Sequence, residues 1–197
     1  MTSQLDTVKS ALAEAQAALD NLVENEAVQQ EIVKAAQLMI QSLKNGGKIL
    51  SCGNGGSLCD SMHFAEELSG RFRLDREPIG AVSMSDPSHM SCVGNDYGYE
   101  EVFSRYLRAV GRKGDVLLAI TTSGTSKNVV RAAEEANKLG IKVVALTGKF
   151  ETPIGRLADV AIVTPGGRFA DRVQELHIKV IHILIELIEG GLASAKN

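Results

Sequence analysis

The sequence lacks the features of a secreted, membrane-spanning or nucleic-acid-binding protein. Its three cysteines are an odd number at irregular spacing with no C-x-x-C pair, which argues against a disulfide framework and for a reducing compartment. The N-terminus is polar and acidic rather than a signal peptide, and no apolar stretch is long enough to span a bilayer. The formal net charge of −3 provides no basic field to attract nucleic acid or an anionic membrane. We therefore expect a soluble, cytoplasmic protein with no membrane and no nucleic-acid partner.

What is present is ordinary globular material. The 197 residues are 44% hydrophobic and 23% charged, which is sufficient for one domain with a substantial core. The chain contains no internal repeat, no low-complexity tract and no linker. We expect a single domain over residues 1–197, in which residues 1–45 form a helical pair for oligomerisation and residues 46–197 form an α/β core.

The first 45 residues have the pattern of two helices. Along the first helix, apolar residues three and four positions apart form a narrow heptad-like seam: Leu5, Val8, Leu12, Ala15, Leu19 and Leu22. A break at residues 24–26 precedes a second helix, which stops at the glycine pair 46–47. Both helices could simply cover one domain, or the first could pack against another subunit. The second interpretation is favoured, because a helical arm outside an α/β core needs a partner to bury it.

From residue 48 onward, short apolar runs alternate with helical patterns. The expected strands are continuous apolar segments at 48–52, 79–84, 115–121, 142–147 and 159–163. The expected helices are 57–70, 99–110, 125–139, 153–158 and a long final one at 171–188. This order predicts a three-layer α/β/α sandwich with a parallel sheet of about five strands, of the flavodoxin or Rossmann type. The small polar tail after Gly190 is expected to fray.

A glycine-rich loop lies between the first expected strand and its helix. Residues 53–57 read Gly-Asn-Gly-Gly-Ser, and a turn of this kind before a helix N-terminus can bind an anion through free amides and the helix dipole. His63 and Glu67 follow on the same helix, four residues apart and therefore on one face. The stretch combines an anion site with a possible acid/base or metal-ligand pair.

A second polar loop follows the third expected strand. Residues 121–126 read Thr-Thr-Ser-Gly-Thr-Ser, and their hydroxyls and amides can bind phosphate oxygens. Serine and threonine also cap helices, so one such loop alone would decide little. Two loops at the carboxyl ends of strands of one sheet favour a ligand site there. Asn95 and Asp96 suit a loop that meets sugar hydroxyls, although Asn-Asp-Tyr-Gly alone is only a turn.

The final helix carries Gln174 and His182, eight residues apart and about 80° apart around the helix axis. A single histidine in so apolar a helix is more often a core or interface residue. Together with His63 and Glu67, however, these side chains supply two imidazoles, a carboxylate and an amide oxygen. Such a set can bind a divalent ion such as zinc, or it can act as acid and base.

These motifs resemble one known family along essentially the whole chain. They are S-C-G-N-G-G-S, H-x-x-x-E-L-x-G-R, V-G-N-D, T-x-S-G-x-S, L-T-G-K and A-D-R-V-Q-E-L-H-I-K-V-I-H. The combination is similar to the sugar isomerase (SIS) domain family, in its branch of sedoheptulose 7-phosphate isomerases. The first two motifs are specific to that branch, whereas T-x-S-G-x-S is common to SIS domains.

The resemblance implies conversion of sedoheptulose 7-phosphate to D-glycero-D-manno-heptose 7-phosphate through an enediolate, the first step toward the heptose of lipopolysaccharide. It implies a phosphate site at Ser57, Thr121, Ser123 and Ser126, and further substrate contacts at Asn54, Gly55, Gly56, Glu67, Arg71, Asn95, Asp96, Thr122, Asp171 and Gln174. It implies one zinc ion per subunit at His63, Glu67, Gln174 and His182, with Glu67 and His182 as the acid/base pair. It also implies a homotetramer whose sites form at subunit contacts.

Two non-enzymatic functions remain as alternatives. One is an SIS-domain tetramer that binds the bacterial replication initiator, but such proteins lack the equivalents of His63, Glu67 and His182. The other is the sugar-phosphate-sensing domain of a transcription regulator. The acidic N-terminal arm here has no basic recognition helix, which argues against that function.

Overall fold

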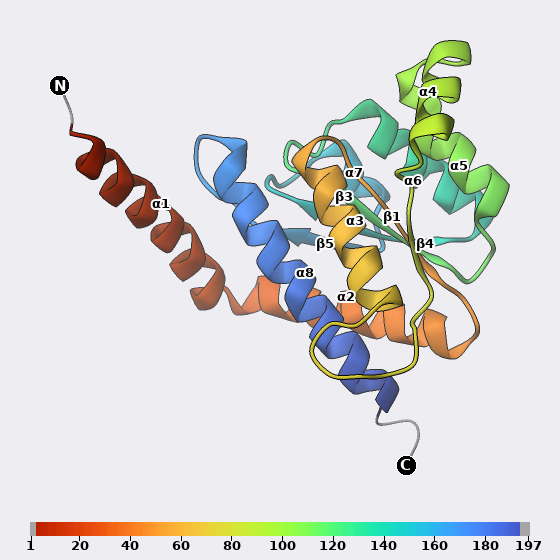
Figure 1. Ribbon diagram of the computed structural model, residues 1–197, viewed down its shortest axis with the longest axis horizontal. Helices are drawn as coiled ribbons and strands as arrows, with labels where there is room; N and C mark the ends of the chain where they lie inside the picture. The colour runs from red at the N-terminus through yellow and green to blue at the C-terminus, as the bar shows by residue number, and fades with distance from the viewer. Residues whose placement is uncertain (1–2, 194–197) are drawn as a thin grey trace.

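The protein, described here by a computed structural model over residues 3–193, is built on a parallel sheet (Figure 1). Five strands pair in the order β2-β1-β3-β4-β5, and all of the pairs are parallel. The strands are β1 (Ile49–Cys52), β2 (Ala81–Ser83), β3 (Val116–Thr121), β4 (Lys142–Thr147) and β5 (Val160–Val163). Each lies within a predicted strand, and the order is that of flavodoxin-like folds. The predicted three-layer architecture is confirmed.

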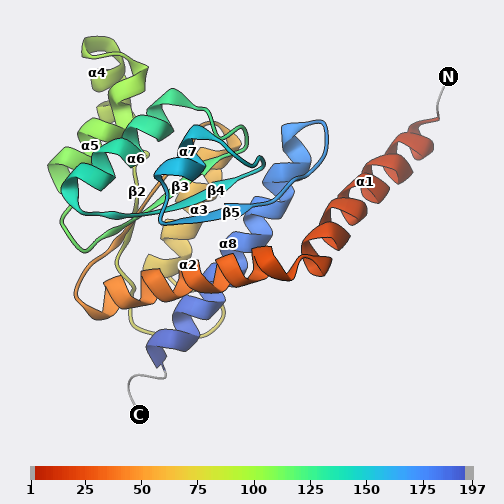
Figure 2. The same ribbon diagram turned by 180° about the vertical axis from the view of Figure 1, so that it is seen from behind.

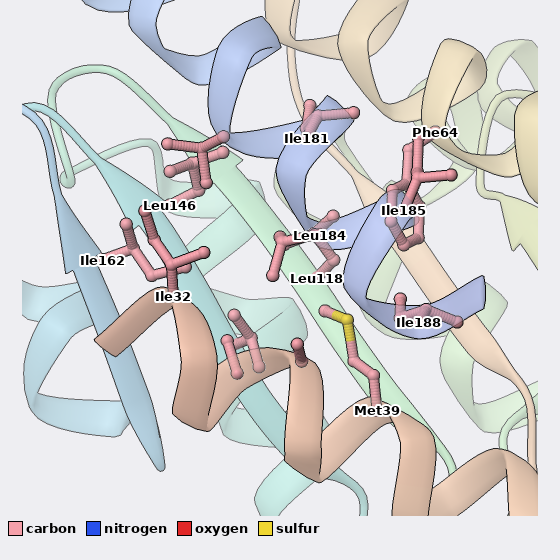
Figure 3. Packing of buried hydrophobic residues seen from close by; sticks show 14 of the residues in the cluster. Ile32, Met39, Phe64, Leu118, Leu146, Ile162, Ile181, Leu184, Ile185 and Ile188 are labelled. Carbon is pink, nitrogen blue, oxygen red and sulfur yellow. The ribbon is translucent and has the colours of Figure 1, made fainter. Parts of the chain in front are cut away.

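Helices cover both faces of the sheet (Figures 1 and 2). One layer contains α2 (Glu26–Lys44), α3 (Gly56–Ser69) and α8 (Ala170–Ala193), and the other contains α4 (Pro87–Asp96), α5 (Val102–Val110), α6 (Lys127–Leu139) and α7 (Pro153–Leu157). Strand residues alternate between the two layers, as the pleat requires. Leu118 and Leu146 pack toward α2 and α8 (Figure 3), whereas Leu117 and Ala145 belong to the cluster on the other face. Within residues 3–193, no helix is long and apolar enough to cross a membrane.

From β1 the chain adds β2 at one side of the sheet and then continues with β3 at the other side, so the direction of strand addition reverses between β1 and β3. These strands are neighbours although β2 lies between them in sequence, and the helix after β1 covers one face while the helix after β3 covers the other. In open α/β sheets, ligands bind at the carboxyl ends of the strands at such a point. Both polar loops of the sequence, 53–57 and 121–126, therefore begin at this crevice.

Helices α3 and α8 run side by side in the same direction (Figure 1). Phe64 and Leu68 of α3 are fully buried, as are Ile181 and Ile185 of α8, and they belong to one cluster (Figure 3). Burying side chains of this size stabilises the pair by about 1.5–3 kcal/mol each. This packing fixes how the polar residues next to them in sequence face one another.

Helix α1 (Gln4–Glu24) extends away from the body as an arm about 31 Å long (Figures 1 and 2). The break after it is formed by Asn25, whose side chain accepts a hydrogen bond from the Val28 amide and caps α2. Near the body, Ala18 and Leu22 are buried on α2 and α8. The first half of the seam is uncovered within the chain, with exposed side-chain fractions of 61%, 54% and 66% at Leu5, Val8 and Leu12.

Three boundaries differ from the sequence-based expectation. Residues 91–96, expected in a loop, belong to α4, whose start is fixed by Pro87 and by the Asp86 side chain; the helix buries only Val93, so its apolar pattern is weak. The helix expected from residue 99 opens with a 3₁₀ turn, η1 (Tyr99–Glu101). Helix α8 continues through its glycine pair to Ala193, and Gly191 packs closely against Ile40. The rest of the tail expected to fray, residues 194–197, lies outside the described residues.

One histidine of α8 is buried in the core. His177 is 0% exposed, and within residues 3–193 neither ring nitrogen has a partner with good hydrogen-bond geometry. The buried hydroxyls of Thr147 and Thr164, at the ends of β4 and β5, also lack partners. Burial lowers the pKa of His177 to about 4, while the Thr147 backbone acts weakly in the opposite direction. The folded protein therefore holds this ring neutral.

This buried ring makes the stability dependent on pH. Between its unfolded pKa of about 6.5 and its folded pKa of about 4, only the unfolded chain takes up the proton. Stability should be fully present above this window and fall by about 1.4 kcal/mol per pH unit within it. Urea unfolding at a series of pH values gives the free energy of unfolding as a function of pH. Between pH 4 and 6.5 this free energy should change less with pH for His177→Leu than for the wild type. Equal slopes would show that His177 does not cause the loss.

Candidate active site

The glycine-rich loop joins β1 to α3 by a tight turn. Gly55 has a φ of +55°, a conformation that favours glycine, and α3 begins at the next residue. A side chain at Gly53 would meet the carbonyl oxygen of Ser57 at 2.5 Å, so the loop folds closely on itself. Ser57 is buried in the first turn of the helix. The amide of Ser57 donates to the Asn54 carbonyl at 3.0 Å, which closes the turn at the start of α3.

The second loop gathers a group of hydroxyls, which we call the hydroxyl cluster: Thr121, Ser123, Thr125 and Ser126. The Thr121 Oγ1 atom lies 3.1 Å from Ser126 Oγ and 3.4 Å from Ser123 Oγ. Thr125 donates its backbone amide to Ser123 Oγ at 3.2 Å. Ser126 stands at the N-cap of α6 but makes no side-chain capping bond. These hydroxyls at the start of a helix can bind phosphate oxygens.

A cavity of about 170 Å³ adjoins the hydroxyl cluster. Thr122 and Ser123 line it together with two cationic residues, Lys149 and Arg168. The Thr122 carbonyl accepts the amide of Gly148 at 3.1 Å, which ties the loop after β4 to the loop after β3. The two cations place positive charge beside the hydroxyls, as an anionic ligand requires.

An amide pair links the two loops across the crevice. Asn54 Nδ2 donates to Asn128 Oδ1 at 2.9 Å, and Asn128 Nδ2 donates to Asn54 Oδ1 at 2.8 Å. The Tyr99 hydroxyl also donates to Asn54 Oδ1, at 3.3 Å. Asn128 and Tyr99 were not among the predicted site residues. Nothing in the sequence distinguishes Asn128, in the first turn of α6, from an ordinary helix residue.

Two helical turns along α3 lies a second group, which we call the His–Glu cluster: His63, Glu67 and His182. The Nε2 atoms of His63 and His182 are 3.0 Å apart, and His63 Nε2 lies 3.7 Å from Glu67 Oε1. Burial lowers the pKa of His182, His63 lowers it further, and Glu67 opposes both. A neutral His182 can donate or accept a proton, or bind a metal. The structure thus brings together three of the residues that the sequence predicted for this chemistry.

Asp60 lies one turn before His63 on the same helix and was not predicted. Its Oδ2 atom is buried without a hydrogen-bond partner. Burial raises the pKa of the carboxyl to about 6, and His63 acts in the opposite direction. A carboxyl with a raised pKa therefore lies between the glycine-rich loop and the His–Glu cluster.

Other predicted site residues lie apart within one chain. Gln174 packs against Gly56, because a Cβ added at Gly56 would meet the Gln174 Nε2 atom at 2.6 Å. Eight residues separate Gln174 from His182, which corresponds to about 12 Å along α8. Arg71 follows the opposite end of α3, about 20 Å from the glycine-rich loop.

Three further predicted residues are exposed and bonded to close neighbours. Asn95 donates to Asp96 at the exposed end of α4, and Asp171 accepts the amide of Arg172. None of the three touches either cluster through a hydrogen bond among those described.

The two ring nitrogens of the His–Glu cluster are spaced as ligands of one zinc ion. Two nitrogens bound to a tetrahedral zinc at about 2.1 Å each lie about 3.4 Å apart, close to the 3.0 Å between the two ring nitrogens. His63, Glu66 and Glu67 also have ligand atoms within 4.8 Å of one another. Two imidazoles and a carboxylate form a set that leaves a fourth position open, as in catalytic zinc sites.

Known proteins are similar to this chain in sequence and in fold. Residues 12–148 match the SIS domain family. A phosphoheptose isomerase of Cytophaga hutchinsonii is 61% identical over 94% of this chain and 97% of its own, and one of Histophilus somni is 58% identical over 98% of each. The solved structure of a phosphoheptose isomerase from Neisseria gonorrhoeae gives a TM-score of 0.88 at 38% identity, over 95% of this chain and all of that one. The family match includes both loops, His63 and Glu67.

The amide pair of Asn54 and Asn128 should contribute to the free energy of unfolding as a coupled unit. Asn128→Leu should lower the free energy of unfolding by about 1–3 kcal/mol, because the Asn54 amide loses its partner. Asn54→Ala in the Asn128→Leu background should then cost little more. Asn137→Leu, which removes an exposed amide on the same helix, should change stability by at most about 0.5 kcal/mol. Additive effects at Asn54 and Asn128, measured by urea unfolding, would contradict the coupling.

Proposed function

The chain belongs to the SIS domain family, in its phosphoheptose isomerase branch, and we propose that it converts sedoheptulose 7-phosphate to D-glycero-D-manno-heptose 7-phosphate. It is an isomerase, as its curated relatives are. The observation that carries the specific reaction is the pairing of a hydroxyl cluster at the crevice with an imidazole–carboxylate cluster farther along α3 and α8. In this proposal the product enters the synthesis of the heptose of lipopolysaccharide.

The hydroxyl cluster holds the phosphate in this proposal. Thr121, Ser123 and Ser126 donate their hydroxyls, and Ser57 reaches the phosphate from the start of α3. Charge–dipole attraction to the start of α6 adds to these hydrogen bonds. Substrate hydroxyls then meet the remaining polar side chains predicted for the crevice: Asn54, Asn95, Asp96, Thr122, Asp171 and Gln174. The backbone of Gly55 and Gly56 adds amide donors.

The length of α3 between the glycine-rich loop and the His–Glu cluster suits an extended sugar phosphate. His63 follows Gly56 by seven residues, so it lies about 10 Å farther along α3. A chain of several carbon atoms can span such a distance with its phosphate at one end and its carbonyl at the other. The reacting carbons C1 and C2 then lie at Glu67 and His182.

The reaction moves one proton between adjacent carbons. Glu67 removes a proton from C1 of the ketose while His182 donates a proton to the carbonyl oxygen at C2, which gives an enediol. The hydroxyl at C1 then loses its proton as C2 receives one, and the aldose is formed. Side chains that stabilise the developing negative charge on oxygen lower the barrier further.

A zinc ion is part of the proposal. His63, Glu67 and His182 would hold it, and when bound it would polarise the oxygen atoms of the hydroxy-carbonyl end. Gln174, the fourth predicted ligand, packs against Gly56, and from that position it supports a contact to the sugar. It reaches the His–Glu cluster only if its side chain turns away from Gly56.

We also propose a homotetramer with composite sites. The exposed half of the seam on α1, at Leu5, Val8 and Leu12, requires an apolar partner that the described chain does not provide. Arg71 is exposed just beyond the end of α3, four residues after Glu67, and in this proposal it contacts the sugar at a site formed between subunits. The three free cysteines agree with a cytoplasmic location.

Replacement of the proposed base tests the reaction. Glu67→Gln should lower kcat for sedoheptulose 7-phosphate by about 10²–10⁴-fold, because the amide cannot take the proton from C1. Glu134→Gln, an exposed change on α6, should leave kcat unchanged. Aldose formation is measured with zinc-loaded and metal-free protein. Near-normal turnover by folded Glu67→Gln would refute the assignment, and no turnover by the wild type would favour a binding protein.

Light scattering tests whether the arm formed by α1 holds the subunits of the tetramer together. The wild type should have four times the 21.0 kDa mass of one chain. Leu12→Asp should shift the mass to smaller species, because a charge enters the seam, whereas Leu74→Asp, on an exposed loop residue, should not. A monomeric wild type would contradict the tetramer.

A further inference from the structure

Arg76 binds the end of α3 and the side of α8 at the same time. It belongs to the loop between α3 and β2. Its Nη2 donates to the Glu67 carbonyl at 2.6 Å, and its Nη1 donates to the carbonyls of Leu68 at 2.8 Å and Gly70 at 3.2 Å. Its Nε donates to Glu189 Oε1 of α8 at 2.6 Å. One guanidinium therefore closes the last turn of α3 and ties it to the neighbouring helix.

This contact is suited to arginine alone. The last carbonyls of a helix lack partners within the helix, and a planar guanidinium can meet several of them at fixed angles. The side chains of Arg76 and Glu189 are 17% and 20% exposed, so solvent screens the pair only partly. A second link, Arg73–Glu186, spans the same two helices at 60% and 55% exposure, where an ion pair contributes little.

The turn that Arg76 closes is the turn that carries Glu67. The backbone carbonyl of Glu67 accepts a hydrogen bond from Arg76, and its carboxylate lies near the His63 ring. The His63 ring in turn contacts His182 of α8. The relative position of α3 and α8 sets the distance between these side chains. A displacement of about 1 Å in a catalytic group can lower a rate by about 100-fold.

We infer that Arg76, with Glu189, is a positioning residue that holds Glu67 and His182 in register for proton transfer. The inference rests on the proposed function, since it assigns Arg76 no contact with the substrate. Its role is to keep the last turn of α3 formed and fixed against α8. Loss of Arg76 should therefore affect turnover more than substrate binding, because the hydroxyl cluster lies at the other end of α3.

The test compares Arg76→Met with a matched loss of a helix-capping arginine. Arg112 donates to the carbonyls of Ala109 and Gly111 at the end of α5, on the opposite face of the sheet. Arg76→Met should lower kcat about 10- to 100-fold with the KM for sedoheptulose 7-phosphate changed less than about threefold. Arg112→Met should lower the melting temperature similarly and leave kcat unchanged. Hydrogen exchange of residues 67–71 should accelerate in Arg76→Met alone.

Two further variants keep the inference testable if Arg76→Met folds poorly. Arg76→Lys keeps the positive charge but loses the planar guanidinium that binds several carbonyls at once. Glu189→Gln removes the ion pair but leaves the contacts of Arg76 with the carbonyls. Both should lower kcat, with Glu189→Gln the milder. A kcat unchanged in the folded Arg76 variants, or a fall matched by Arg112→Met, would overturn the inference. If Glu67→Gln stayed active, the proposed function would fail instead.

Discussion

The structure depends on the parallel packing of α3 against α8 on one face of the sheet. Phe64 and Leu68 on α3 meet Ile181 and Ile185 on α8 in a fully buried cluster. His63 and His182 are sequence neighbours of Phe64 and Ile181, so this apolar contact also brings together the two rings, which are more than a hundred positions apart. The hydrophobic core thereby determines the geometry of the proposed chemistry, and polar contacts such as those of Arg76 refine it.

The sheet supplies the second half of the site. The change of direction between β1 and β3 places two polar loops at one edge, and the amide pair of Asn54 and Asn128 holds them together. Ser126 illustrates how a common residue gains a function here. It stands where a capping serine is expected, yet its hydroxyl faces Thr121 and the crevice rather than the helix backbone.

Much of this could be predicted from the sequence, for physical reasons. Continuous apolar runs identified the five strands, and the polar loops after two of them identified the ligand edge. Helix α4 was missed because it buries only Val93 and therefore shows no apolar period. Arg76 was missed because its partners are mostly backbone carbonyls, which every residue has, and Asn128 because its partner amide is 74 positions away. Three arginines occur within residues 71–76, and no local pattern tells which one caps α3. The packing of Gln174 against Gly56 also required coordinates.

The central claim is that the two clusters act on the two ends of one sugar phosphate. It is tested most directly by a crystal structure of the Glu67→Gln variant with sedoheptulose 7-phosphate. The account predicts phosphate oxygens within hydrogen-bond distance of the Ser123 and Ser126 hydroxyls, with C1 and C2 between residue 67 and His182. The same structure would reveal whether both clusters come from one subunit. A phosphate bound at the histidines, or a carbonyl end remote from residue 67, would contradict the account.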